Sequence, residues 1–182
     1  MTEWLWLVAV LAVLLVALLG SWLTWTANRL DRMHHRIDVA RASLDTQLLR
    51  RSATTLELAT SGALDPARSL LLVDAAHQAR GAVDGDFEAA ESDLSEALRA
   101  VFRDDAELRA LEELPGTGEL LAELRADCRK VELARRFHND VVVNARALRS
   151  RRRVRWLRLA GRAAPLSTVD LDDRPPPALV HE

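Results

Sequence analysis

The chain begins with an uninterrupted apolar run and then changes to regularly spaced apolar positions. Residues 4–25 contain no charged side chain. As a helix they would be about 33 Å long, which is enough to cross a hydrocarbon core of about 30 Å. Tryptophans mark both ends of the run, as in the aromatic belts of membrane helices: Trp4, Trp6, Trp22 and Trp25. The pattern predicts a transmembrane helix over residues 4–25, after a short extracytoplasmic N-terminus of residues 1–3.

A cleaved signal peptide is the alternative explanation for the same run. Such a peptide needs a basic start and small residues before its cleavage site. Residues 1–3 contain no Lys or Arg, and Trp22 directly follows Gly20 and Ser21. We therefore expect a retained anchor. Arginines follow the run and none precedes it, so the positive-inside rule predicts an outer N-terminus and a cytoplasmic C-terminal domain at the plasma (inner) membrane.

The rest of the chain has helical spacing and almost no strand signal. A stripe of apolar residues three or four positions apart runs through residues 26–60, and no Pro or Gly separates it from the apolar run. One long helix should therefore leave the membrane. Asp65 and Pro66 predict the cap and the first position of a second helix, which ends near Arg80 with Gly81 as its cap.

Further helices are predicted over residues 86–103 and from Glu119 toward Ala160, with a short helix or turn over residues 104–114. Leu70-Leu71-Leu72-Val73 is apolar on nearly all sides of the second helix, so we expect it to be buried. The predicted fold class is all-α, with the transmembrane helix continuing into an antiparallel four-helix bundle over residues 26–162. Residues 163–182 are rich in Pro and Asp and predict a disordered, solvated tail.

Charge is distributed unevenly along a chain whose formal net charge is −2. Residues 61–128 contain 16 acidic residues and 6 arginines, for a net charge of −10. Residues 129–162 contain 12 basic and 2 acidic residues, for a net charge of +10. One interpretation is complementarity between neighbouring helices, which contributes little for each exposed pair.

Residues 146–162 contain eight arginines and no acidic residue, with apolar side chains on the opposite side of a helical wheel. This pattern predicts a basic amphipathic segment that binds the anionic lipid headgroups of the cytoplasmic leaflet. A plain solvated face is the alternative, and nucleic-acid binding lacks any further motif. The lipid-surface candidates are Arg151, Arg152, Arg153, Arg155, Trp156 and Arg158.

The sequence contains no complete catalytic or metal-binding motif. Residues 85–105 match the first positions of the box of Nudix pyrophosphohydrolases at Gly85, Glu91 and Arg99. That box needs two adjacent glutamates for magnesium, and Arg103 stands at one of these positions. We therefore expect no enzymatic activity, no catalytic residue, no metal and no cofactor, with a Nudix-type hydrolase as the less favoured alternative.

Two stretches of the chain resemble the LemA family of bacterial membrane proteins. The long helix after the apolar run contains Gln47-Leu48 followed by Arg50-Arg51. The fourth predicted helix carries the better match: Glu132, Ala134, Arg135, Phe137, His138, Asn139 and Asn144. The chain departs from the family pattern where Ser52-Ala53-Thr54-Thr55 replaces a Pro-Asn pair, and where His138 replaces a Tyr.

The resemblance implies a membrane-anchored helical bundle that acts as a scaffold or protein-interaction module. We expect its partner surface in the groove between the first and fourth helices. The candidates are Arg50, Arg51, Arg135, His138, Asn139 and Asn144. Two alternatives remain open: the asparagines could hydrogen-bond within the bundle, and His138 lies on the core stripe and so could be packed. The partner would be an unidentified protein, and a homo-oligomer of parallel anchors is also compatible with the pattern.

Overall fold

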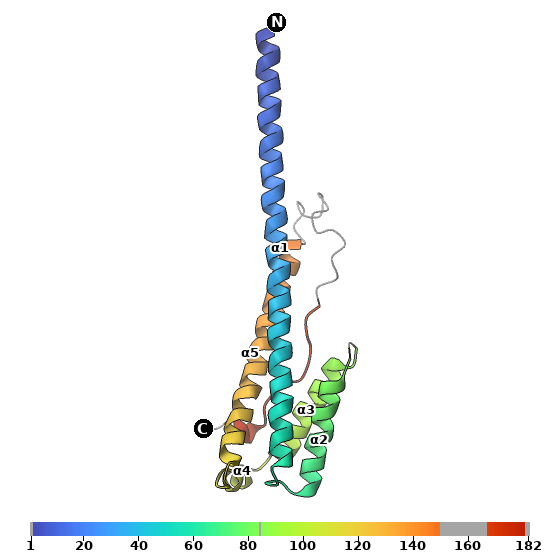
Figure 1. Ribbon diagram of the computed structural model, residues 1–182, viewed down its shortest axis with the longest axis vertical. Helices are drawn as coiled ribbons and strands as arrows, with labels where there is room; N and C mark the ends of the chain where they lie inside the picture. Colours follow the sequence, from blue (N-terminus) through green and yellow to red (C-terminus); the bar gives the residue numbers. More distant parts are fainter. Residues whose placement is uncertain (1, 84, 150–166, 181–182) are drawn as a thin grey trace. The chain divides into compact units, whose positions relative to one another are not determined.

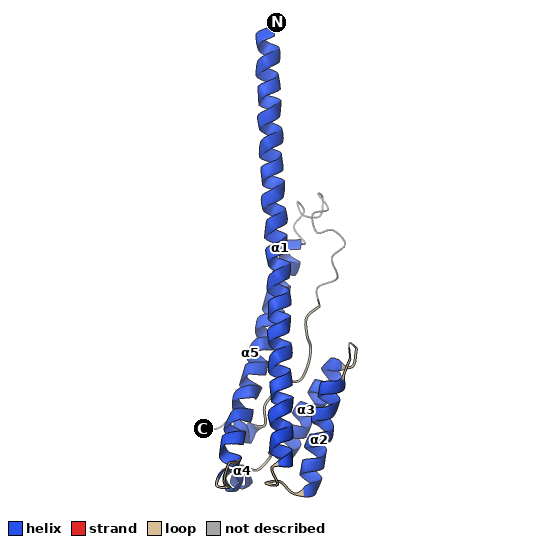
Figure 2. Ribbon diagram, viewed as in Figure 1, coloured by secondary structure: helices blue, strands red, loops and turns tan. Residues whose placement is uncertain are grey.

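The structure is a computed structural model that describes residues 2–83, 85–149 and 167–180. Within these residues all regular elements are helices (Figures 1 and 2). The elements are α1 (Thr2–Thr60), α2 (Pro66–Gly81), α3 (Phe87–Val101), α4 (Asp105–Glu112), α5 (Thr117–Arg149) and the short 3-10 helix η1 (Pro177–Leu179). The predicted all-α class is confirmed for this part of the chain.

The chain divides into two compact units. Unit 1 comprises Met1–Asp38 and Val141–Leu166, and unit 2 comprises Val39–Asp140 and Ser167–Glu182. Helices α1 and α5 each contribute residues to both units.

The N-terminal part of α1 is apolar and uncovered. Helix α1 continues unbroken from Thr2 to Thr60, as the absence of Pro and Gly after the apolar run predicted. Its segment Glu3–Trp22 has a mean hydropathy of 2.5, and none of that segment is buried by the described chain. By length and composition it could be a membrane span or a signal sequence.

Local signals in the sequence account for the helix ends in unit 2. Asp65 Oδ1 accepts hydrogen bonds from the backbone N–H groups of Ala67 (3.0 Å) and Arg68 (3.1 Å), so it caps α2 as predicted. Gly81 is still helical and Ala82 is the C-terminal cap, so the prediction that Gly81 caps α2 is wrong.

The break between α4 and α5 depends on two glycines. Gly116 has a φ of +77°, a left-handed conformation that side-chain-bearing residues rarely adopt. A Cβ atom on Gly118 would lie 2.8 Å from the backbone oxygen of Glu112, so a larger residue would force the turn apart. The predicted break therefore has a steric cause at both positions.

Two clusters of buried apolar side chains form the core of unit 2. The larger one joins residues of α1, α2, α3, α4, α5 and η1, and includes Leu58, Leu72, Leu98, Leu124 and Leu179. The smaller one joins Leu44 and Leu48 of α1 to Val131 of α5, and also contains Val169 and Leu171. Each fully buried side chain of this size contributes about 1.5–3 kcal/mol.

The expectation that Leu70-Leu71-Leu72-Val73 is buried is wrong for half of it. Leu72 is fully buried, but Leu70 is 69% exposed and Leu71 is 45% exposed. The core face of α2 is the row Leu72, Ala75, Ala76 and Ala79. Helical geometry turns Leu70 and Leu71 away from that row, because residues one or two positions apart point to different sides.

The prediction of a disordered tail over residues 163–182 is wrong for residues 167–180. Val169, Leu171, Ala178 and Leu179 are each 5% exposed or less, and they belong to the two core clusters. Residues 169–173 alternate buried and more exposed side chains, which is the pattern of an extended segment with one covered face. The prediction missed this alternation because it covers only residues 169–173, within a segment whose Pro and Asp content is typical of disorder.

Candidate functional site

The clearest recognition geometry in unit 2 surrounds residues 167–174, which we call the C-terminal segment. It lies against α1, α3 and α5, and we call the surface of these helices that it covers the groove. Figure 1 shows the chain before η1 running beside these helices. The floor of the groove consists of Leu44 and Leu48 from α1 and Val131 from α5, with Phe87 and Ala134 packed at its sides. Val169 and Leu171 of the segment insert into this floor.

Helix α5 holds one side of the segment. The side-chain amide of Asn139 donates from Nδ2 to the backbone oxygen of Val169 (2.9 Å), and Asn139 Oδ1 accepts from the backbone N–H of Val169 (2.9 Å). This paired contact is similar to the pairing of two strands, because it engages only main-chain atoms of the segment. Asn139 would therefore accept any side chain at that position.

Arg135, one helical turn before Asn139, binds the carboxylate of Asp173. Its Nε donates to Asp173 Oδ2 (2.6 Å) and its Nη2 donates to Asp173 Oδ1 (2.9 Å). This forked pair is the strongest geometry for an Arg and a carboxylate. The hydrogen bond from Arg135 to Asp173 raises the pKa of the guanidinium further above its ordinary value.

Helix α3 holds the other side of the segment. Glu88 Oε1 accepts from the backbone N–H of Asp170, and Ser92 Oγ accepts from that of Asp172, both at 3.0 Å. Arg99 donates to Asp172 Oδ2 and to the backbone oxygen of Arg174, both at 2.8 Å. The pKa of Asp172 is well below its usual range, chiefly because Arg174 donates to its carboxylate.

His138 lies beneath the start of the segment. The residue is 3% exposed, so the prediction that it belongs to a partner surface is wrong and the packed alternative holds. Burial lowers the pKa of its imidazole, and a hydrogen bond with the backbone of Ser167 partly opposes that effect. Among the described groups, none hydrogen-bonds to its Nδ1.

The partner-surface prediction is also wrong for Arg51, which is buried. It is 1% exposed, and it joins α1 to α3 through Glu91 Oε2 (2.6 Å) and Ser95 Oγ (2.9 Å). Breaking such a buried pair costs about 3–5 kcal/mol, because the remaining charge has no partner. Arg50, the next residue on α1, is exposed. Asn144, the last candidate of this set, is exposed on the part of α5 that belongs to unit 1.

A second buried polar contact was not found from the sequence. Thr54 Oγ1 of α1 donates to Asp127 Oδ2 of α5 (2.9 Å), and Lys130 donates to Asp127 Oδ1 (3.0 Å). Asp127 is 1% exposed. Thr54 lies in the stretch where the chain departs from the LemA pattern. The only sequence signal was an acidic residue, Asp127, between two apolar core positions, Leu124 and Cys128.

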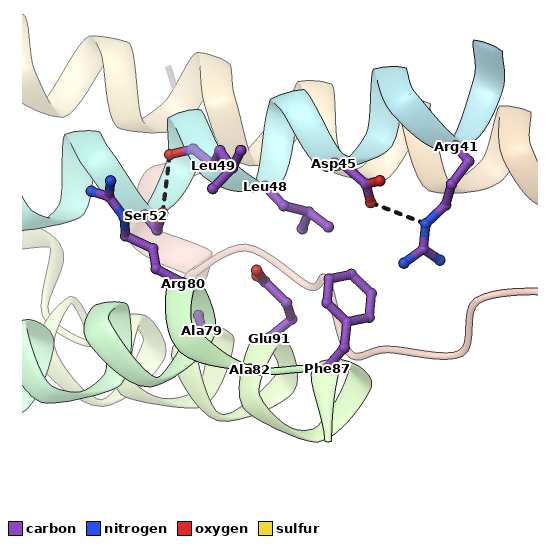
Figure 3. A pocket seen from close by; sticks show the side chains of 10 residues that line it. All are labelled: Arg41, Asp45, Leu48, Leu49, Ser52, Ala79, Arg80, Ala82, Phe87 and Glu91. Atoms are coloured by element: carbon purple, nitrogen blue, oxygen red, sulfur yellow. Dashed lines mark hydrogen bonds and ion pairs between the residues drawn. The ribbon is translucent and has the colours of Figure 1, made fainter. Parts of the chain in front are cut away.

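A small cavity lies between α1 and the α2–α3 pair (Figure 3). Its volume is about 230 Å³, which is below the roughly 300–1,000 Å³ of typical ligand pockets. Arg41 lies over the ring of Phe87, 4.8 Å from its centroid, and pairs with Asp45. Figure 3 shows the Glu91 carboxylate pointing from α3 toward α1, where Arg51 binds it. The cavity is lined by Arg41, Asp45, Leu48, Leu49, Ser52, Ala79, Arg80, Ala82, Phe87 and Glu91.

Metal-binding and nucleophilic side chains were two kinds of candidate chemistry in the described part of the chain. Residues 2–83, 85–149 and 167–180 contain no group of three His, Cys, Asp or Glu side chains that could hold a metal ion. Burial raises the pKa of the Cys128 thiol, which keeps it protonated and unreactive. Two matched positions of the Nudix-like stretch have structural contacts, Glu91 with Arg51 and Arg99 with Asp172.

The structure thus gathers Arg135, His138 and Asn139 at one groove, but these residues contact the chain's own C-terminal segment. The lipid-surface candidates, Arg151 to Arg158, lie outside the described residues. No family model matches the chain, and no curated protein or solved structure matches it. The resemblance to the LemA family therefore depends on the quoted residues alone.

Proposed function

We propose that this protein is a membrane-anchored, non-enzymatic interaction module of the LemA type. In this proposal α1 anchors the chain with its N-terminus outside, and unit 2 is an antiparallel four-helix bundle in the cytoplasm that binds an extended polypeptide segment. The observation that carries the proposal is the groove of α1, α3 and α5. Side chains of this groove form hydrogen bonds with the main chain of residues 169–172.

Anchoring is supported by the uncovered apolar part of α1. Large side chains along it are exposed in the described chain, for example Leu11 at 65% and Leu18 at 70%. Such a surface is stable in lipid, whereas in water it would drive association. The arginines that follow the segment support the cytoplasmic position of unit 2.

Recognition of a polypeptide is supported by the separate contacts that the groove makes with the main chain and with the side chains of the segment. Asn139, Glu88 and Ser92 bind main-chain atoms, which every polypeptide has. The apolar floor selects residues two positions apart, because these share a face of an extended chain. Arg135 and Arg99 select acidic residues at the next positions. The groove therefore fits an extended segment with two alternate apolar residues followed by two acidic ones.

A non-enzymatic role is supported by how the buried charged groups of unit 2 are used. Glu91 is bound by Arg51, and Asp127 is bound by Thr54 and Lys130. A general acid, a general base or a nucleophile must reach a substrate. These groups connect helices instead.

Peptide titration tests the proposal. The full-length protein without residues 167–182 is placed in nanodiscs and titrated with a synthetic peptide of residues 167–180. A matched control peptide has Val169 exchanged with Asp170 and Leu171 exchanged with Asp172, which moves the apolar side chains to the other face at constant composition. We expect only the native peptide to bind. Equal binding of both peptides, or binding of neither to a helical protein, would contradict the proposal.

A further inference from the structure

We infer that the C-terminal segment is an intramolecular competitor that occupies a binding groove for a separate protein. The partner would present an extended segment of the same chemistry, with two alternate apolar residues followed by two acidic residues. The inference rests on the proposed function, because it takes the groove as a peptide-binding surface. It adds the class of partner and the way in which access to the groove is controlled.

The first support is that the helices build their main core without the segment. The larger core cluster joins α1, α2, α3, α4 and α5, and residues 167–174 are absent from it. The segment contributes only Val169 and Leu171 to the smaller cluster. Removing residues 167–174 from the groove would therefore uncover a preformed apolar floor and leave the helical core in place.

The second support is that the contacts of the segment can be exchanged. Its backbone is held by side chains of Asn139, Glu88 and Ser92, and a second extended chain offers the same main-chain atoms to them. The ion pairs also reach solvent. The side chains of Arg99 and Asp172 are each 25% exposed. In the second pair the side chain of Arg135 is 22% exposed, and that of Asp173 is 7% exposed. A competing carboxylate can approach such partly exposed pairs, whereas the Arg51–Glu91 pair is closed to it.

The third support is that the segment has an anchor of its own beyond the groove. Ala178 and Leu179 of η1 are 4% and 2% exposed and belong to the larger cluster. Residues 167–174 can therefore leave the groove while η1 keeps the end of the chain bound. Because η1 stays bound, the C-terminal segment keeps a high effective concentration near the groove and rebinds quickly.

The charges of the groove fit the proposed partner. Arg135 of α5 and Arg99 of α3 flank the position of the two acidic residues from opposite sides. When the segment leaves, these guanidinium groups lose their carboxylate partners. An acidic segment therefore gains from binding there, and a basic segment is repelled.

The test uses the full-length protein in nanodiscs and a fluorescent peptide of residues 167–174 as the probe. Val169→Asp with Leu171→Asp should release the segment, because both side chains leave an apolar floor, while the groove and η1 are unchanged. Asp172→Ala with Asp173→Ala is a second releasing variant, which removes the carboxylates that Arg99 and Arg135 bind. Val180→Asp is the matched control, because Val180 is 55% exposed.

We expect both releasing variants to bind the probe about tenfold or more tightly than the wild-type chain and the control do. A groove that is open one-tenth of the time loses about tenfold in apparent affinity. Arg135→Glu in the releasing background should abolish binding. Circular dichroism checks that each variant keeps its helices.

Several results would overturn the inference. Equal affinity in wild-type and released chains would mean that the segment does not compete. If the protein without residues 167–182 binds the peptide but the releasing variants do not, the inference fails while the proposed function stands. If no form binds, both fail. Crosslinks between position 139 of one chain and position 169 of a differently tagged chain would assign the groove to a second copy instead of a separate partner.

Discussion

Arg51 and Arg135 were both predicted for one partner surface, and unit 2 uses them in different ways. Arg51 is 1% exposed and binds Glu91 and Ser95 between two helices. Arg135 keeps 22% of its side chain exposed and binds Asp173 of the C-terminal segment. The first contact is sealed from water and holds the helices in register. The second stays within reach of solvent and of a competing carboxylate.

The same residue type can therefore serve stability or recognition, depending on how far it is buried. A sealed ion pair cannot lose one member without leaving a charge in an apolar setting. A partly exposed pair can, because water and salt screen the remaining charge.

The largest effect is expected from Arg51→Met. This change leaves the buried Glu91 carboxylate without its cation, so we expect the free energy of unfolding to fall by about 3–5 kcal/mol. Urea unfolding of the detergent-solubilised protein, followed by circular dichroism, measures it. The control is Arg50→Met at the exposed neighbouring position, which should change stability by about 0.5 kcal/mol or less. Similar losses in the two variants would remove the contrast between buried and exposed arginines.

A smaller and local effect is expected from Asn139→Ala. The substitution removes both hydrogen bonds to the main chain of Val169, at a cost of about 1–3 kcal/mol. Hydrogen exchange in residues 167–174 should accelerate while that of α2 and α3 stays unchanged. Asn144→Ala is the matched control, because Asn144 is exposed. Faster exchange in the control variant would contradict the assignment of segment binding to Asn139.

A weaker effect is expected from acidification. Burial lowers the pKa of folded His138, so its contribution is complete above the unfolded value of about 6.5 and declines as pH falls below that value. The lowered pKa of Asp172 makes its contribution complete above about 3.9, and it is lost as pH falls through the folded value.

A fluorophore at position 170, which is exposed within the C-terminal segment, should report this loosening as falling anisotropy in two steps, one below neutral pH and one in strong acid. Arg41 and Asp45 of α1 and the backbone of Ser167 act on His138. The variant His138→Gln should therefore lose the upper step and keep the lower one. If the upper step persists in that variant, another group is responsible for it.

The smallest effect on unit 2 is expected from replacing Arg151, Arg152, Arg153, Arg155 and Arg158 with Gln. Unfolding of unit 2 should not change, whereas the amount of anionic lipid that copurifies with the full-length protein should fall. Each Arg near an anionic surface contributes about 1 kcal/mol. Lipid mass spectrometry measures the loss. An unchanged lipid content would refute lipid binding by residues 146–162.

Much of the helical layout could be predicted because its signals are local. The cap at Asp65 and Pro66, the break at Gly116 and the continuity of α1 each depend on a few neighbouring residues. The groove was predicted in part, since Arg135 and Asn139 were named. The sequence analysis did not predict that the C-terminal segment covers the groove. Val169 and Leu171 are recognised as core residues only when the apolar side chains they contact are known.

Local sequence signals account for the apolar N-terminal helix, the all-helical class of the described chain and most helix boundaries. Apolar runs, caps and glycine turns act over a few residues and need no partner. Tertiary packing determines that Leu70 is exposed, that Arg51 is buried and that Val169, Leu171, Ala178 and Leu179 are covered. Burial of these residues depends on the surfaces opposite them, and those surfaces come from distant segments of the chain, as Leu44 and Leu171 of one core cluster illustrate.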